Sequence, residues 1–398
     1  MSEAPSERPR PGPAAPLALA CPRAEPSGWR AQIERHNAEI RAQGRWRSIR
    51  ALADGAAETR IAATGQAVVS FASNDYLGLS QHPALAAAAA DAIHRFGTGT
   101  GASRLVVGAR PIHAELEREL ADWKDAEAAL LFPTGFAANV GLLAALGRFG
   151  ELCIASDALN HASIIDGARL SRARLAVYEH GNLDQLAATL SRSQRAVVVS
   201  DAVFSMDGDV ADVDALAALC VRHAALLVLD EAHAVLGPKT PRLPGLELLV
   251  VGTLSKTLGS LGGFVAGPHP YIDWLVNSAR TFIFTTASPP GDAAAALAAL
   301  RIVRSAEGAA LEARLRANVA RLRPGHPSPI VPIVLGEEAR AVAISEALLA
   351  RGLLVPAIRP PTVPLGSSRL RVALSAAHTP LQVDALARAL AELGCPAS

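Results

Sequence analysis

The sequence predicts an α/β fold, in which helices cover both faces of a mainly parallel sheet and a smaller α+β domain follows. Two observations support this prediction. Short apolar runs alternate with helical patterns between residues 67 and 266. Each run is apolar throughout, as in strands that are buried on both faces. With 398 residues, half of them hydrophobic, the chain is long enough for more than one domain.

The elements are expected in a definite order. Residues 1–28 contain seven prolines and are expected to form a flexible tail, and an amphipathic helical arm should cover 29–50. The expected strands are 67–72, 152–155, 175–178, 196–200, 225–229, 248–252 and 263–266. The expected helices are 111–124, 137–146, 183–190, 213–223 and 292–304. From about residue 300 the pattern is helix, strand, helix, strand, helix. The predicted domains are an N-terminal arm over 29–72, a large domain over 73–298 and a small domain over 299–398.

Composition argues against several classes of protein. A formal net charge of +1 gives no reason to expect nucleic acid or an anionic membrane as a partner. The four cysteines lie far apart, as expected for reduced thiols in a cytoplasmic protein. Residues 128–147 are uncharged, but Pro133-Thr134-Gly135 and Asn139 predict a strand end, a turn and a buried helix rather than a membrane span. The metal motifs His-Glu-x-x-His and Cys-x-x-Cys do not occur, so no metal is expected.

Three polar residues come directly after apolar runs. They are Asp201, Asp230 and Thr253. Ligands of open α/β sheets bind beyond the carboxyl ends of the strands. The sequence therefore predicts a site where these residues converge.

One lysine stands in a run of small and hydroxyl residues, Thr253-Leu254-Ser255-Lys256-Thr257-Leu258-Gly259. Such a lysine can hold an aldehyde cofactor as a Schiff base, while Asp230 keeps the ring nitrogen of that cofactor protonated. The pair predicts pyridoxal phosphate (PLP). The plainer alternatives are a solvated loop lysine and a strand-end aspartate that caps a helix.

Other motifs have two interpretations each. Asp230-Glu231-Ala232-His233 has the letters of a helicase signature, but the phosphate loop of an ATP motor does not occur. Thr134-Gly135-Phe136 could anchor a phosphate at a helix start or simply begin a helix. The glycines at 97, 99 and 101 do not match a dinucleotide fingerprint and are expected in a flexible loop near the site. His161 could stack on a cofactor ring or cap a helix.

As a set, these stretches resemble the α-oxoamine synthase family of fold-type-I PLP-dependent transferases over about residues 29–395. The matching stretches are Ser73-Asn74-Asp75-Tyr76-Leu77-Gly78-Leu79, Gly99-Thr100-Gly101-Ala102-Ser103-Arg104, Ser156-Asp157-Ala158-Leu159-Asn160-His161-Ala162-Ser163, Val203-Phe204-Ser205-Met206-Asp207-Gly208-Asp209, the Asp-Glu-Ala-His run and the Lys256 run. Within the family, Ile358-Arg359-Pro360-Pro361-Thr362-Val363-Pro364 resembles the alanine-using enzyme of biotin synthesis.

The resemblance implies cofactor roles for particular residues. Lys256 would carry the cofactor and then act as base and acid at the substrate Cα, with Asp230 at the ring nitrogen and His161 stacked on the ring. The remaining implied cofactor contacts are Ser205 and His233 near the phenolic oxygen, Gly135, Phe136 and Thr253 at the phosphate, and Thr285 or Thr286 at the phosphate of a neighbouring subunit. The last contact implies a homodimer.

The resemblance also implies substrates, L-alanine and a pimeloyl thioester of coenzyme A or of an acyl carrier protein. Arg359 would bind the alanine carboxylate, and Asn74 and Thr362 would line the acyl channel. Arg47 would be the substrate arginine of the arm, with Arg45 as a competing choice. A glycine-using relative (2-amino-3-oxobutyrate ligase or 5-aminolevulinate synthase) and a non-catalytic scaffold of the same fold are the alternatives.

One segment departs from the family pattern. Members usually continue the Asp-Glu-Ala-His run with glycine and a Gly-Arg-Gly segment, whereas this chain has a shorter, proline-rich loop over 237–245. We therefore expect a loop of different shape over the cofactor. The departure leaves the acyl preference open.

Overall fold

The computed structural model describes residues 28–395 and divides the chain into two compact units between Arg50 and Ala51. The predicted tail, residues 1–28, therefore lies almost wholly outside the described residues. In the first unit α1 spans Trp29–Ala42, so the predicted helix ends eight residues early. Gly44 has φ +67°, and the N–H groups of Gly44 and Arg45 donate to the carbonyls of Arg41 and Ile40. This is the glycine-terminated helix end known as a Schellman motif, which explains the early stop.

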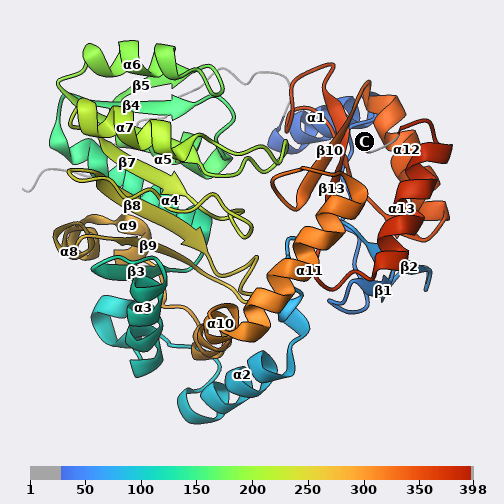
Figure 1. Cartoon of the computed structure of the whole chain (residues 1–398), viewed down its shortest axis with the longest axis horizontal. Coiled ribbons are helices and arrows are strands. Elements are labelled where there is room, and N and C mark those ends of the chain that lie inside the picture. The colour runs from blue at the N-terminus through green and yellow to red at the C-terminus, as the bar shows by residue number, and fades with distance from the viewer. Residues whose placement is uncertain (1–27, 396–398) are drawn as a thin grey trace, which may run out of the picture. The chain divides into compact units, whose positions relative to one another are not determined.

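In the second unit a seven-stranded sheet has the order β3-β9-β8-β7-β6-β4-β5 (Figure 1). Its strands are β3 (Ala128–Phe132), β4 (Leu152–Asp157), β5 (Arg174–Tyr178), β6 (Arg195–Asp201), β7 (Leu226–Asp230), β8 (Glu247–Thr253) and β9 (Gly263–Gly267). β5, β4, β6, β7 and β8 run parallel to one another, and β9 is antiparallel to both β8 and β3. The predicted α/β fold with a mainly parallel sheet is confirmed.

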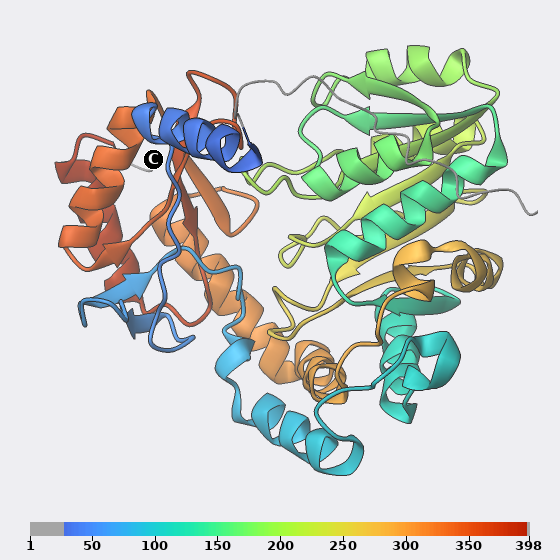
Figure 2. The same ribbon diagram turned by 180° about the vertical axis from the view of Figure 1, so that it is seen from behind.

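Helices cover both faces of this sheet (Figures 1 and 2). They are α3 (Pro111–Trp123), α4 (Gly135–Leu146), α5 (Ala162–Ser171), α6 (Leu183–Ser191), α7 (Val213–Arg222), α8 (His269–Ser278), α9 (Arg280–Ile283) and α10 (Pro290–Val303). α2 (Pro83–Phe96) packs against α10 instead. Along each strand alternate residues face opposite sides. Val228 packs in the core beneath α4 and α5, while Leu227 and Leu229 pack in the core beneath α6 and α7. Both faces are thus buried, which is why the strands read as uninterrupted apolar runs.

The C-terminal part combines helices with a small antiparallel sheet. Its elements are α11 (Ala306–Leu322), β10 (Ile330–Gly336), α12 (Glu338–Ala350), β11 (Leu353–Leu354), β12 (Ala357–Ile358), β13 (Ser368–Ala373) and α13 (Pro380–Glu392). The sheet order is β10-β13-β12, and both pairings are antiparallel. This agrees with the predicted helix, strand, helix, strand, helix, with two short strands added. The proposed domain boundaries remain predictions.

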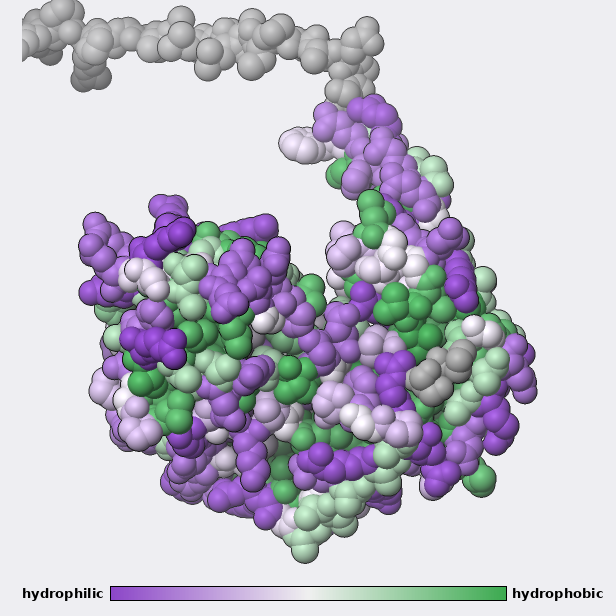
Figure 3. Space-filling view, turned by 45° about the horizontal axis from the view of Figure 1, so that its top comes forward, coloured by the Kyte–Doolittle hydropathy of each residue, from purple (hydrophilic) through white to green (hydrophobic). Residues whose placement is uncertain are grey.

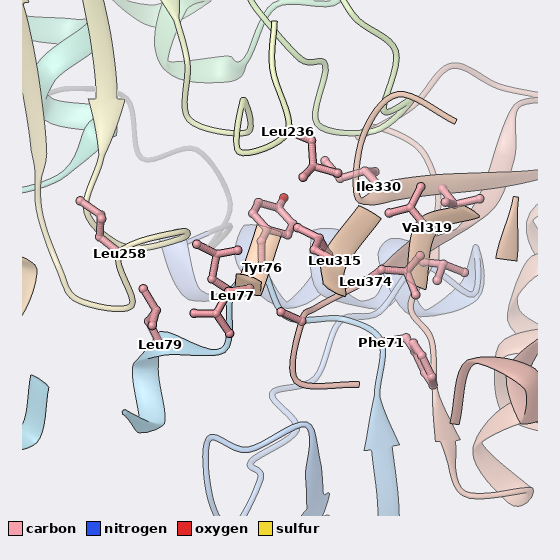
Figure 4. Close-up of a cluster of buried hydrophobic side chains, with 14 of the residues drawn as sticks. Phe71, Tyr76, Leu77, Leu79, Leu236, Leu258, Leu315, Val319, Ile330 and Leu374 are labelled. Carbon is pink, nitrogen blue, oxygen red and sulfur yellow. The ribbon is translucent and has the colours of Figure 1, made fainter. Parts of the chain in front are cut away.

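An early segment of the chain completes this C-terminal part. β1 (Glu58–Arg60) pairs with β2 (Ala67–Ser70), and β2 pairs in parallel with β11. Farther on, Phe71 and Tyr76 accept backbone hydrogen bonds from Ala373 and Ala376. Tyr76 belongs to one buried cluster with Leu77, Leu236 and Leu315 (Figure 4). This cluster joins chain segments that are more than 200 residues apart.

Hydrophilic and hydrophobic residues are mixed on the face of the molecule that Figure 3 shows. On the face drawn in Figure 3, hydrophilic residues predominate and hydrophobic residues are exposed in smaller groups between them. Among residues 28–395, no helix is both long enough and apolar enough to cross a bilayer.

Candidate active site

The carboxyl ends of three neighbouring strands carry polar side chains. Asp201, Asp230 and Thr253 are the last residues of β6, β7 and β8. Asp201 lies opposite Asp230 in the sheet register, and Ala202 N donates to the Asp230 carbonyl at 2.8 Å. The apolar runs of the sequence therefore place these residues at one sheet edge.

Lys256 lies in the connection between β8 and β9, at the same edge. Its Nζ is 2.9 Å from Nε2 of His233, and His233 is only 5% exposed. Burial lowers the pKa of Lys256; the carboxylates of Asp230 and Asp201 oppose this shift, and the guanidinium of Arg371 adds to it. The lowered pKa enlarges the fraction of neutral amine, the form that attacks an aldehyde.

The glycine three residues after Lys256 has a structural role. Gly259 has φ +58°, and a Cβ at this position would lie 2.5 Å from the backbone nitrogen of Ser80. Only glycine fits such a close approach in the left-handed region. Gly259, one of the small residues of the Lys256 run, is therefore explained by the packing of two chain segments.

Asp230 is buried at the bottom of the site. Its Oδ1 accepts a hydrogen bond from Ala232 N at 2.9 Å, and its Oδ2 accepts one from Asn139 Nδ2 at 2.7 Å. The same Nδ2 also donates to Ser163 Oγ at 2.9 Å. In the described part of the chain, Asn139 Oδ1 is buried without a hydrogen-bond partner. The carboxylate is thus fixed in orientation, with an unused acceptor close beside it.

Asp201 and His161 meet next to Asp230. Burial and the neighbouring Asp230 raise the pKa of Asp201 well above its ordinary value, which favours its protonated form. Asp201 Oδ2 accepts a hydrogen bond from His161 N at 2.8 Å. His161 precedes α5, and its Nδ1 lies 2.7 Å from Ser163 Oγ. Burial lowers the pKa of His161, Asp230 opposes this shift and Lys256 adds to it, so the neutral ring is favoured.

The start of α4 offers an anion site on the same side. Thr134 caps the helix by accepting a hydrogen bond from Ala137 N at 3.0 Å. The N–H groups of Gly135 and Phe136, in the first turn, have no partner inside the helix. A Cβ on Gly135 would lie 3.3 Å from Cβ of Thr253, whose Oγ1 is 2.7 Å from Ser255 Oγ. Amides, helix dipole and hydroxyls together suit a phosphate group.

A second group of contacts enters from the C-terminal part. Arg371 of β13 is 5% exposed, and it donates through Nε to the Ser205 carbonyl at 2.5 Å and through Nη2 to Asn74 Oδ1 at 3.1 Å. Tyr76 is fully buried, and its hydroxyl is 2.6 Å from His233 Nδ1. Burial raises the pKa of Tyr76 to about 12, against the influence of Arg371.

The sequence reasoning assigned no role to Asn139, Tyr76 or Arg371. A signal existed for two of them. Asn139 is a polar residue in an otherwise uncharged helix, and Arg371 interrupts an apolar strand. No local pattern indicated a functional role for Tyr76, because an aromatic residue next to a leucine is typical of a hydrophobic core.

The remaining predicted residues lie in other segments. Thr286 forms a bridge with Ser103, which places Thr285 and Thr286 beside residues 103–107. Arg359 follows β12, and its carbonyl accepts a hydrogen bond from Thr362 N at 3.0 Å. Arg45 and Arg47 belong to the first unit. Their substrate roles remain predictions.

The proline-rich loop over 237–245 is held by its neighbours. Thr240 Oγ1 donates to Glu231 Oε1 at 2.5 Å, and Arg242 donates to the Lys124 carbonyl. Arg316 of α11 donates to the Leu236 carbonyl at 2.9 Å. A cavity of about 590 Å³ lies between this loop, the end of α3 and the start of α11, with Thr253 in its wall. The described contacts thus tie the loop to α3 and α11.

The donor set fits PLP by its chemistry. The half-buried amine of Lys256 suits an aldehyde, the buried carboxylate of Asp230 suits a protonated ring nitrogen, and the start of α4 suits a phosphate. The unused Asn139 Oδ1 adds a buried acceptor at the same place. Within residues 28–395, no group of three or more His, Cys, Asp or Glu side chains is arranged to hold a metal ion.

The comparisons with known proteins agree with one another. The sequence model of the family described as aminotransferase class I and II matches residues 66–390. An 8-amino-7-oxononanoate synthase from Anaeromyxobacter dehalogenans is 53% identical over 346 residues, which cover 82% of this chain and 86% of that protein. One from Burkholderia cenocepacia is 46% identical over 372 residues, covering 87% of this chain and 94% of that protein.

Two solved structures share the fold over most of the chain. A serine palmitoyltransferase from S. paucimobilis, which contains PLP and myriocin, has 30% identity and a TM-score of 0.83, covering 91% of this chain and 98% of that chain. An 8-amino-7-oxononanoate synthase from Francisella tularensis has 27% identity and a TM-score of 0.69, covering 82% and 96%. The resemblance found in the sequence is confirmed. The chain belongs to the aminotransferase class I and II family and, within it, to the family of the 8-amino-7-oxononanoate synthases.

Proposed function

We propose that this chain is a PLP-dependent acyltransferase of biotin biosynthesis. It condenses L-alanine with a pimeloyl thioester and releases 8-amino-7-oxononanoate, CO2 and the free carrier thiol. The observation that carries the proposal is the 46–53% identity to proteins named 8-amino-7-oxononanoate synthase, over 82–92% of the chain. The group of Lys256 with the buried His233 and Asp230 supplies the matching chemistry.

The site residues hold the cofactor in this proposal. Lys256 binds its aldehyde carbon, and Asp230 is paired with its ring nitrogen. His161 lies against its ring, and Ser205 and His233 bond near its phenolic oxygen. The amides of Gly135 and Phe136, with Thr253, bind its phosphate. When bound, PLP supplies an electron sink for negative charge that develops at the amino-acid Cα.

The substrates are bound by groups around this centre. Arg359 binds the alanine carboxylate, for which a planar guanidinium offers two parallel hydrogen bonds. Asn74 and Thr362 line the acyl channel, and Arg47 is the substrate arginine of the arm, with Arg45 as the competing choice. Support for the Asn74 assignment is its fixed amide, which accepts a hydrogen bond from the buried Arg371.

Lys256 carries the proton in the reaction. Its neutral amine removes the Cα proton of alanine and later returns a proton to the same carbon. Between these events a bond forms from Cα to the pimeloyl carbonyl carbon, and sulfur leaves with the electron pair of the C–S bond. The bond from Cα to the carboxylate breaks to give CO2. Burial favours this chemistry because it lowers the pKa of Lys256, so that the amine is available as a base.

A second copy of the chain completes the site in this proposal. Leu105, Val106 and Val107 are 51%, 72% and 69% exposed, and Phe284 is 69% exposed. The bridge between Ser103 and Thr286 places the two segments that carry these residues side by side. Apolar patches of this kind mark protein interfaces. Thr285 or Thr286 would then reach the phosphate of the partner. Mixing Lys256→Ala with a Thr285→Ala, Thr286→Ala double variant should restore activity in mixed dimers, and a monomer in solution would contradict the proposal.

The acyl carrier is coenzyme A or an acyl carrier protein, and the enzyme acts in the cytoplasm. Both carriers present the same pimeloyl thioester, so the two can be distinguished only by assaying each of them separately. The assay therefore runs with pimeloyl-coenzyme A and with pimeloyl carrier protein in parallel.

The deciding experiment measures product and CO2 from purified protein loaded with PLP. L-Alanine with a pimeloyl thioester should give 8-amino-7-oxononanoate and equimolar CO2, and Lys256→Ala should give neither. Glycine and a series of acyl lengths serve as competing substrates. Faster turnover of glycine, or no CO2 from the loaded wild type, would contradict the proposed reaction.

A further inference from the structure

The hydroxyl of Tyr76 lies between two polar side chains at the end of an otherwise apolar environment. It is 2.6 Å from Nδ1 of His233 and 3.1 Å from Oδ1 of Asn74. The ring itself is buried with Leu77, Leu236 and Leu315 (Figure 4). A buried tyrosine hydroxyl needs a hydrogen-bond partner, and here two are available.

The orientation of the Asn74 amide follows from Arg371. Nη2 of Arg371 is 3.1 Å from the same Asn74 oxygen that faces Tyr76. A guanidinium has only donors, so the atom that faces it must be the amide oxygen. Asn74 can therefore accept a hydrogen bond from Tyr76 but cannot donate one through that atom.

On its other side His233 meets Lys256. The distance from His233 Nε2 to Lys256 Nζ is 2.9 Å. Burial lowers the pKa of His233 well below its ordinary value, and the charges of Lys256 and Arg371 and the nearby His161 lower it further. The ring is therefore neutral and carries a hydrogen on one nitrogen only.

Counting hydrogens leaves two arrangements. If Tyr76 donates to Asn74, it accepts from Nδ1–H of His233, and the bare Nε2 accepts from Lys256. If Tyr76 donates to Nδ1, the hydrogen of His233 is on Nε2 and points at Lys256. The second arrangement requires a neutral Lys256, because an ammonium group has no acceptor.

We propose that Tyr76 is a positioning residue whose hydroxyl sets the tautomer of His233, so that His233 can accept a hydrogen bond from Lys256 as ammonium or donate one to it as amine. The chain Asn74, Tyr76, His233, Lys256 is then a two-position relay. When Lys256 gives a proton to substrate or solvent, the ring hydrogen of His233 moves from Nδ1 to Nε2 and the Tyr76 hydroxyl turns from Asn74 to Nδ1; the reverse happens when Lys256 takes a proton up. Tyr76 and His233 keep one polar hydrogen each throughout, and only Lys256 changes its proton count.

The relay bears on catalysis through the proposed function, in which Lys256 alternates between amine and ammonium at the substrate Cα. The other charged and titratable groups that face Lys256 and His233 are Asp230, Asp201, Arg371 and His161. The two acids raise the pKa of Lys256, and Arg371 lowers it. The hydrogen bond at Nδ1, made by Tyr76, determines which nitrogen of His233 holds the hydrogen.

The test follows the ring nitrogens of His233 by 15N NMR in the full-length chain without added PLP or substrate. Over the same pH series, a small reagent that modifies amines is added, and mass spectrometry measures how fast it modifies Lys256. The pH dependence of this rate gives the pKa of Lys256. In the wild type the Nδ1–H signal should decline as Lys256 loses its proton. In Tyr76→Phe the buried Nδ1 loses its partner, so the hydrogen should stay on Nε2 at every pH. Lys256 should then titrate about one pH unit lower, a roughly tenfold change in its neutral fraction at a given pH.

Tyr178→Phe is the matched control, because Tyr178 is also buried but lies on the edge strand β5. It should leave both readouts unchanged. The relay is wrong if Tyr76→Phe folds and Lys256 has the same pKa in this variant as in the wild type. If that variant does not fold, the pH series on the wild type is sufficient as a test. His233 signals that stay constant while Lys256 loses its proton would overturn the proposal. Neither readout depends on turnover of substrate. The relay can therefore be disproved without affecting the proposed reaction, which the assay of product and CO2 tests separately.

Discussion

Lys124 Nζ lies 2.6 Å from Oε2 of Glu231, the residue that follows Asp230 in the site. The pair is nearly buried, with 12% of the lysine side chain and 4% of the glutamate side chain exposed. Thr240 of the proline-rich loop donates to the other carboxylate oxygen. One ion pair thus connects the end of α3, the site and that loop.

Lys124→Met should destabilise the protein strongly, because it leaves the carboxylate of Glu231 buried without its counter-charge. We expect the free energy of unfolding to fall by about 3–5 kcal/mol, measured by urea denaturation. Arg301→Met removes a partner from the more exposed pair with Glu115 and should cost under about 1 kcal/mol. Equal effects of the two substitutions would show that the Lys124 pair contributes no more than a surface contact.

Asn139→Ala should weaken PLP binding without unfolding the protein. Asn139 donates to Asp230 Oδ2, and losing a hydrogen bond to a charged group costs about 1.5–3 kcal/mol. The dissociation constant for PLP, measured by absorbance titration, should rise about ten- to hundredfold. Asn318→Ala is the control, since this buried asparagine bonds the carbonyls of Ser375 and His378 instead. A larger loss of PLP affinity in the control would refute the assignment.

His180 should make stability depend on pH. Burial lowers its pKa, but hydrogen bonds to Asp157 at 2.9 Å and Asp209 at 2.6 Å raise it more, so the pKa lies above its ordinary value. A raised pKa means that the folded state holds the proton more tightly than the unfolded chain. The stabilisation is complete below about pH 6.5 and is lost as pH rises through the higher folded pKa.

The measurement compares melting temperatures of the wild type and His180→Gln across a pH series. The wild type should be more stable at low pH, and the difference should shrink as pH rises above about 6.5. His269→Gln, at an exposed histidine, is the control for the substitution itself. A constant difference between the wild type and His180→Gln would mean that the two carboxylates do not bind the charged ring.

Arg359→Ala should chiefly raise the KM for alanine, by about ten- to hundredfold, because a charge-assisted bond to the substrate carboxylate is lost. The KM for the pimeloyl thioester should change much less. Steady-state kinetics with each substrate varied in turn checks this, with the exposed Arg388→Ala of α13 as control. An unaltered KM for alanine would assign its carboxylate to another group.

A site residue could be predicted from the sequence where its position depends on residues close to it in the sequence. Asp201, Asp230 and Thr253 were placed correctly at one sheet edge, since each ends an uninterrupted apolar run. Arg371 and Asn74 meet across 297 positions, so no periodicity could join them. Tyr76 illustrates the same limit. Its aromatic ring next to a leucine indicates a core position, and only the fold brings its hydroxyl to His233.

The pairing of β2 with β11 also bears on how the protein is made. A ribosome releases the chain from the N-terminus, and the strands of the large sheet, β3 to β9, are complete by Gly267. The segment that carries Asn74 and Tyr76 is made earlier, but it must wait for residues 353–376 before its backbone partners exist. The first-made residues of the site are therefore among the last to be fixed. A chain truncated before β11 could pair its large sheet and still lack a finished catalytic centre.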